Sequence, residues 1–215
     1  MTSQELMKKT FAEVLDGAAE TIEDFPWHDR KAYCHWLSQT YYLVRHTSRL
    51  LCLAAGQTLI DDDATHHAFI QHLKEELRHD LPLLKDLKAL GHTPSEFEEL
   101  PETQLLINNQ YFWLNSGHAH ALQGYALLLE GLSLHCIPHM KSELEKAGFG
   151  HATSFIKLHY ESDETHYPEG LERASLLTAS SHPEILANLK QSAFLYRSIY
   201  ERVAVLSRAE IRKSA

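Results

Sequence analysis

The chain has 215 residues, of which 44% are hydrophobic and 23% charged, an ordinary composition for a soluble globular protein. A chain of this length can bury about 70% of the surface of its unfolded form, so we expect one domain over residues 1–215. The formal net charge of −9 argues against a nucleic-acid partner. Because the sequence has neither an apolar run of about 18 residues nor a signal segment, we expect no membrane partner and a cytoplasmic location.

The N-terminal quarter of the sequence predicts two helices. Thr2 and Glu5 match a capping box, and the helix that they open should end near Phe25. A second helix is expected over residues 29–55, because Gly56 is a natural C-terminal cap.

The second helix carries a polar stripe within an otherwise apolar pattern. Its members recur at positions i, i+4, i+7 and i+11, and they therefore share one face of the helix. Such a stripe lines a pocket or joins hydrogen-bonded residues of the core or of an interface, and the pattern leaves both interpretations open. The stripe consists of His35, Gln39, Tyr42 and His46.

The third helix is expected over residues 61–90, capped by aspartates at its start and followed by Gly91. Pro82 lies inside this range, just after His79. A proline in a helix removes a backbone hydrogen bond, so we expect either a kink or a boundary between two helices here.

The remaining sequence predicts a short helix over 93–96 and further helices over about 101–117 and 118–147. A sixth helix follows a glycine-containing connector at 148–150, and Pro168 should interrupt it. The last helix begins at His182, and its long apolar stripe leaves a homodimer open as a partner. Because no segment alternates with a period of two residues, we predict an all-α bundle of seven or eight helices.

The segment 159–166 carries the pattern most typical of a metal site. Positions i, i+4 and i+7 of a helix fall within about 40° of one another, so His159, Asp163 and His166 should share one face. Two imidazoles and a carboxylate suit iron, manganese or zinc better than calcium.

Two further segments complete a candidate donor set. Glu76 and His79 have the Glu-x-x-His spacing by which di-metal carboxylate proteins present two ligands to one metal from a single helix. Glu130 lies in an apolar run, where a carboxylate must be neutral, paired or metal-bound. Together with the first three residues, they make three carboxylates and three imidazoles, enough for two metals.

With these residues in view, the sequence resembles the haem-oxygenase-like di-iron oxidases, relatives of thiaminase-type and pyrroloquinoline-quinone synthase proteins. The resemblance covers roughly residues 30–170 and rests on segments 72–80 (HLKEELRHD), 86–91 and 125–130, and on the 159–166 pattern. It implies a haem-oxygenase-like bundle in which the iron ligands are Glu76, His79, Glu130, His159, Asp163 and His166.

The sequence departs from the family pattern in the second helix. Some members supply a further carboxylate from this helix, whereas the acidic residue here is Asp29 at its start. Tyr42 or His46 is then expected to face the metals as a pocket-lining residue. Within the third helix, His72 and Glu75 compete with Glu76 as ligands.

The resemblance implies an oxidase or oxygenase with two ferrous ions, with manganese open at one site, and with dioxygen as co-substrate. A separate electron donor is expected, and the substrate would be a small amino-acid-like or fatty-acid-like molecule. The alternatives are a metal-free thiaminase-like or quinone-synthase-like enzyme, a haem-binding protein with His35 or His46 as axial ligand, and a structural or partner-binding protein.

Overall fold

The computed structural model describes the backbone of residues 1–214 and the side chains of residues 1–208, so Ala215 lies outside it. Every regular element within residues 1–214 is a helix, which confirms the predicted all-α class. The described part contains eight α-helices and two 3₁₀ helices: α1 (Ser3–Glu23), α2 (Arg30–Gln57), α3 (Asp63–Glu75), α4 (Asp80–Ala89), η1 (Pro94–Glu96), α5 (Pro101–Asn115), η2 (Ala119–Ala121), α6 (Leu122–Lys146), α7 (Ser154–Leu176) and α8 (His182–Ser214). None of these helices is both long and apolar enough to cross a membrane.

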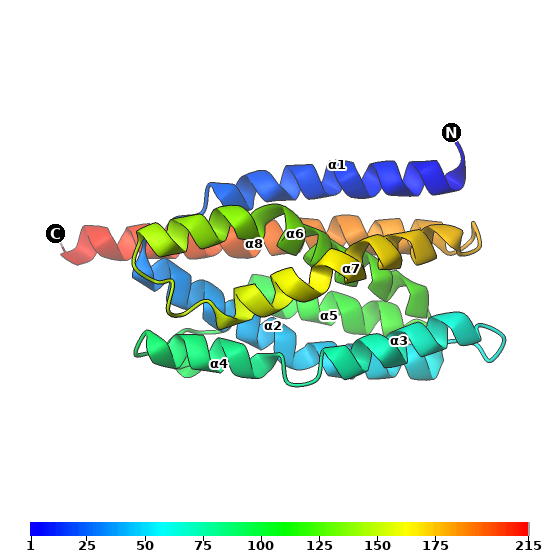
Figure 1. Ribbon diagram of the computed structural model, residues 1–215, viewed down its shortest axis with the longest axis horizontal. Coiled ribbons are helices and arrows are strands. Elements are labelled where there is room, and N and C mark those ends of the chain that lie inside the picture. Colours follow the sequence, from blue (N-terminus) through cyan, green and yellow to red (C-terminus); the bar gives the residue numbers. More distant parts are fainter. Residues whose placement is uncertain (215) are drawn as a thin grey trace.

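The α-helices lie roughly along one long axis (Figure 1). Helix α1 forms one edge of the bundle, and α3 and α4 follow one another along the opposite edge. Helix α6 packs against both α7 and α8, while α2 packs against α3, α4 and α5. The space between α2, α3, α6 and α7 therefore lies inside the bundle.

The starts of the first two helices follow from local capping. Thr2 Oγ1 accepts a hydrogen bond from Glu5 N at 3.1 Å, as the capping box predicts. Asp29 caps α2 by accepting from Lys31 N at 2.8 Å. These caps fix where the first two helices enter the bundle.

The predicted third helix is two helices, separated at residues 76–79. Arg78 has a φ of 69°, in the left-handed region that costs a non-glycine residue about 1 kcal/mol or more. Pro82 lies in the first turn of α4, where its missing N–H would have no partner in the helix. The boundary that the sequence left open is confirmed, and the chain turns before the proline.

The prediction that Pro168 interrupts the sixth helix is wrong, because α7 runs through it from Ser154 to Leu176. Proline removes the hydrogen bond to the carbonyl of Glu164. Both residues are exposed, so water can satisfy that carbonyl. Helix α6 likewise continues past Pro138.

Helices α6 and α8 come very close at Gly124. A Cβ atom added there would lie 2.2 Å from Ile185 O and 2.7 Å from Leu189 N. Both neighbours are backbone atoms of α8, and they cannot move aside as a side chain could. The close approach of these two helices therefore requires glycine at this position.

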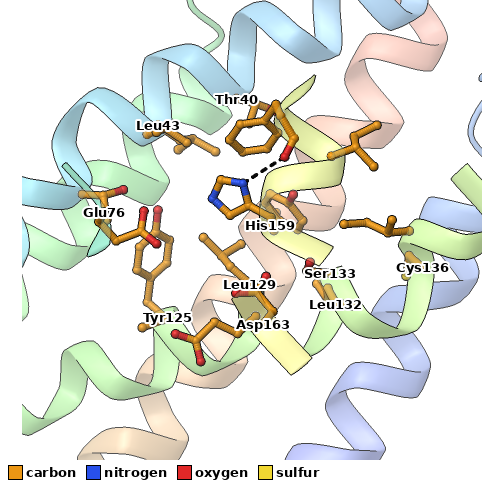
Figure 2. Close-up of a pocket in the computed structure, with 18 of the residues that line it drawn as sticks. Thr40, Leu43, Glu76, Tyr125, Leu129, Leu132, Ser133, Cys136, His159 and Asp163 are labelled. Atoms are coloured by element: carbon orange, nitrogen blue, oxygen red, sulfur yellow. Dashed lines mark hydrogen bonds between the residues drawn. The ribbon is translucent and has the colours of Figure 1, made fainter. Parts of the chain in front are cut away.

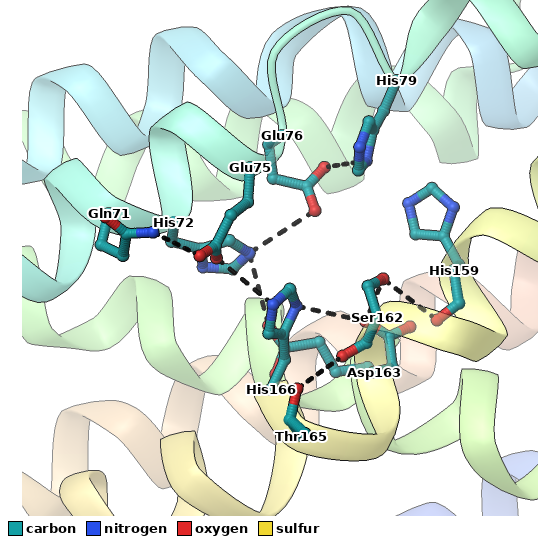
Figure 3. A network of polar contacts seen from close by, with 11 residues as sticks. Gln71, His72, Glu75, Glu76, His79, His159, Ser162, Asp163, Thr165 and His166 are labelled. Carbon is teal, nitrogen blue, oxygen red and sulfur yellow. Dashed lines mark hydrogen bonds and ion pairs between the residues drawn. The ribbon is translucent and has the colours of Figure 1, made fainter.

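Helix α3 has the fewest buried side chains of the α-helices in the described part of the chain. Its main helical neighbour is α2, and Thr65 and Phe69 are its buried residues among the side chains that the structure describes. Its other face turns toward α6 and α7, across the interior where the polar side chains gather (Figure 3).

Candidate metal centre

The position of α7 in the bundle is set by a carboxylate from α4. Asp86 is fully buried, and its two oxygens accept hydrogen bonds from Ser154 N and Phe155 N, each at 2.9 Å. Asp86 thereby satisfies the free N–H groups at the start of α7 and places a negative charge at the positive end of the helix dipole. The contact anchors the helix one turn before His159.

A first group of donors consists of Glu76, His79 and His159. One ligand atom of each residue lies within 4.8 Å of the others. His159 Nδ1 donates to Phe155 O at 3.1 Å, because a carbonyl can only accept (Figure 2). This hydrogen bond fixes the ring tautomer and leaves Nε2 with a free lone pair, the arrangement usual for a histidine that binds a metal.

A second group of donors lies beside the first and contains Asp163 and His166 together with His72 and Glu75 (Figure 3). Glu130 belongs to the same group through its contact with His72. His166 lies between two carboxylates, with Nε2 3.3 Å from Glu75 Oε2 and Nδ1 3.7 Å from Asp163 Oδ1. His72 Nε2 is 3.4 Å from Glu130 Oε1 and 3.6 Å from Glu76 Oε1. His72 thus connects the two groups.

All six residues predicted as ligands lie in this cluster, but one detail of the prediction is wrong. Glu76 and His79 do not project from a single helix, since Glu76 ends α3 and His79 precedes α4. The turn between them still brings Glu76 Oε2 within 3.1 Å of His79 Nδ1. His72 and Glu75, expected to compete with Glu76 as ligands, contact other members of the cluster: His72 lies near Glu130, and Glu75 lies near His166. The i, i+4 spacing of His72 and Glu76 is the sequence signal that places His72 in the cluster.

Tyr42 and His46 do not face the cluster, so the expectation that they line its pocket is wrong. The Tyr42 hydroxyl lies 2.9 Å from Pro94 O and 3.0 Å from Phe97 O, and His46 Nδ1 lies 3.1 Å from Tyr111 OH. The interior face of α2 instead carries Thr40, Leu43, Val44 and Thr47.

The polar stripe of α2 joins the helix to the segment that follows η1. Gln39 is fully buried; it accepts from Leu100 N at 3.0 Å and donates to Glu98 O at 2.8 Å. Of the two interpretations that the sequence left open, the hydrogen-bonded interface is therefore correct.

The pKa values of the ionisable groups in the cluster are shifted in different directions. Burial alone would raise the pKa of Glu76, but the adjacent His72 and His79 outweigh it and hold that pKa well below its usual range. Burial raises the pKa of Glu130 to about 7, with His72 opposing the shift. Burial lowers the pKa of His159 and leaves its imidazole neutral. One carboxylate is therefore ionised in the apoprotein, while a second retains a proton near neutral pH.

The arrangement fits a metal better than a closed network of hydrogen bonds. Among the residues that the structure describes, Glu130 Oε2 is buried without a hydrogen-bond partner. His79 Nδ1 and His166 Nδ1 are also buried, and they face carboxylate oxygens of the cluster at 3.1 Å and 3.7 Å without hydrogen-bond geometry. Buried polar atoms without partners are costly, and each of these can bind a divalent cation.

Metal affinity is expected to depend on pH through Glu130. With a pKa of about 7, its carboxyl is mostly protonated at pH 6 and must lose that proton to bind a cation. We expect ferrous affinity to rise at least about tenfold from pH 6 to pH 8, with at least about one proton released per chain at pH 6. His166 adds to this dependence, because the adjacent Asp163 raises its pKa and the ring must be neutral to bind a cation. Calorimetry in buffers of different ionisation enthalpy measures this release, and a flat affinity over this range would contradict it.

Two cavities meet at the cluster. The first, of about 120 Å³, runs between α2, α6, α7 and α8, and it is mostly apolar (Figure 2). The second, of about 140 Å³, lies between α3, α6 and α7 and is more polar. His72, Ala126 and Glu130 line both cavities, so they form the wall between them.

The helix arrangement is that of the haem-oxygenase-like fold. One similar solved structure is a domain of unknown function with a heme oxygenase-like fold from Shewanella denitrificans OS217, with a TM-score of 0.81 and 18% identity over 100% of this chain and 96% of that chain. Another is a TenA homolog from Pseudomonas syringae pv. tomato DC3000, with a TM-score of 0.72 and 15% identity over 92% of each chain. At these identities the likeness establishes the fold.

The family follows from the sequence. Residues 34–196 match the family described as "Iron-containing redox enzyme", and the chain belongs to that family. The matched range includes all eight donors of the cluster. No curated protein matches the chain closely enough to specify a reaction.

Proposed function

We propose that the protein is a non-haem di-iron oxidase or oxygenase that uses dioxygen to oxidise or cleave a small organic substrate. The observation that carries this proposal is the cluster of four carboxylates and four imidazoles, in which three buried atoms among the described residues make no well-formed hydrogen bond. Membership of the iron-containing redox enzyme family supports iron as the metal.

In this proposal the two groups of donors hold one ion each. Glu76, His79 and His159 would hold the first, while Glu130, Asp163 and His166 would hold the second. Iron bound there would supply the capacity to activate dioxygen. The neutral ring of His159 fixes geometry, whereas Glu130 can give up its proton when a cation arrives. Manganese at one site remains compatible with the same donors.

The apolar cavity supports a substrate with a hydrocarbon part. Its ionisable acids and imidazoles are members of the cluster at one end, and no Lys or Arg is among the described residues that line it. The rest of the wall is mostly apolar, with side chains such as Leu129, Leu132, Ile137 and Met140. A fatty-acid-like molecule fits this lining better than an amino-acid-like one, because an ammonium group would have no counter-ion away from the cluster. Such a substrate would meet the cluster with its polar end.

Anaerobic ferrous titration of the apoprotein tests the proposal. We expect about two irons per chain, and after oxygen is admitted we expect absorbance changes that depend on bound iron. An electron donor is then required for repeated turnover, and candidate reductants can be compared by the number of oxidation cycles that they sustain.

The titration also distinguishes the proposal from its main alternative. If the chain takes up no stoichiometric iron, the di-iron proposal fails. The cluster would then have to act as a metal-free acid–base site on the fold that the TenA homolog shares. Substrate turnover by metal-free protein in the presence of a chelator would support that alternative.

A further inference from the structure

The polar cavity leads from the cluster to the surface between α3 and α7. At its inner end it is lined by His72, Glu75, Glu130 and His166. At its outer end Thr65, Glu169 and Arg173 also line a groove on the surface of the molecule. The cavity and the groove therefore share a boundary, and together they reach from solvent to the second group of donors.

The lining of this cavity suits a hydrated divalent cation. Side-chain oxygens line it from both sides: Gln71 and Glu75 from α3, Gln123 from α6, and Glu169 from α7. Carboxylate and amide oxygens are ligands that can replace the water molecules of a hard divalent ion one at a time. The apolar cavity offers few such groups, so an ion entering through it would lose its hydration without compensation.

One buried side chain points from the cluster into this cavity. Glu130 is 8% exposed, and its Oε2 atom has no hydrogen-bond partner within the described part of the chain. Oε2 lies 3.8 Å from the place where a Cβ of Gly170 would be, and Gly170 lines the polar cavity. An ion that passed through the cavity would therefore meet an unsatisfied carboxylate oxygen at its inner end.

The charged side chains at the outer end differ in whether they form ion pairs. Asp62 Oδ2 pairs with His120 Nε2 at 2.8 Å, and Glu172 pairs with Lys8. Glu169 has no ion pair among the described residues and is exposed. Arg173 is the one arginine among the described residues that line the polar cavity, and it is also exposed. Glu169 should thus attract an arriving cation, and Arg173 should oppose it.

We propose that ferrous iron enters the cluster through this polar cavity, by way of the groove between α3 and α7, and that Glu169 and Arg173 set its rate of entry. The inference rests on the proposed di-iron function. It concerns the route of the metal, which the organic substrate in the apolar cavity does not share.

Stopped-flow uptake of Fe²⁺ by the apoprotein under anaerobic conditions tests the charges. Neither residue is among the proposed ligands, so the variants should keep the wild-type iron content. We expect Glu169→Gln to slow uptake about threefold to tenfold and Arg173→Gln to speed it by a similar factor, with both effects shrinking at high salt. Equal uptake rates in both variants and the wild type would overturn the role of these charges.

A second pair of variants tests the route itself. Ala68→Phe places a ring in the polar cavity, and Ser133→Phe places the same ring in the apolar cavity. We expect the first to slow uptake about tenfold or more and the second to leave the rate within about twofold. The reverse order would overturn the proposed route, whereas absence of iron in the wild type would instead contradict the di-iron function. Circular dichroism and thermal unfolding verify that both variants fold.

Discussion

Replacing His159 with alanine is expected to reduce the iron content from about two to about one per chain. His159 provides the neutral imidazole of the first donor group, and its lone pair faces Glu76 and His79. Loss of a direct ligand should weaken that site by at least about 100-fold, the upper range for loss of an outer-shell partner. Metal analysis of protein reconstituted anaerobically and then desalted measures the effect.

A matched control lies on the same helix. Glu161 is an exposed residue two positions along α7, and Glu161→Gln removes a carboxylate without touching the cluster. This variant should retain the full iron content. If His159→Ala also retained it, the first group would not be a metal site, and the six-ligand interpretation would have to be abandoned.

The largest expected effect on stability comes from Gly124→Ala. The added methyl group would lie 2.2 Å from Ile185 O, a backbone atom, so α6 and α8 must separate. We expect the free energy of unfolding to fall by at least about 3 kcal/mol, the upper range for overpacking. Urea denaturation measures the change, and failure to express in soluble form would agree with it.

Gly17→Ala is the matched control for this substitution. Gly17 lies within α1, and a Cβ added there has no heavy atom within 4 Å in the described structure. Because alanine restricts the unfolded chain and favours the helix, we expect a gain of about 0.5–1 kcal/mol. If both glycine variants changed stability alike, the close approach of α6 and α8 would not be the cause.

The fold was predictable where local chemistry decides it. Thr2 and Asp29 mark helix starts because their side chains accept hydrogen bonds from the first turn, and both helices begin where the sequence predicts. The predicted cap at Gly56 is wrong, since α2 continues to Gln57 and Gly56 does not adopt a positive φ. Pro168 shows the limit of this reasoning. Whether a proline ends a helix depends on whether water can reach the freed carbonyl, which is a property of the bundle.

The site was predictable in its members and less so in its arrangement. The i, i+4, i+7 spacing of His159, Asp163 and His166 places them on one face whatever the tertiary structure is. Tyr42 and His46 also follow helical spacing, yet their side chains contact Pro94 and Tyr111 and not the cluster. The rotation of α2 about its axis is set by packing on several neighbours, and no spacing within one helix contains that information.

The sparse anchoring of α3 has a consequence for how the protein tolerates mutation. Because Thr65 and Phe69 are the buried residues of this helix and the partly buried Ile70 and Leu73 supply its other core contacts, substitutions at its polar positions should change the unfolding free energy by less than about 1 kcal/mol. A selection for soluble expression would therefore accept changes at Gln71, His72 and Glu75 that a selection for bound metal rejects. Substitution profiles collected under the two selections would diverge most on this helix, and the positions where they differ would identify functional residues without knowledge of the substrate.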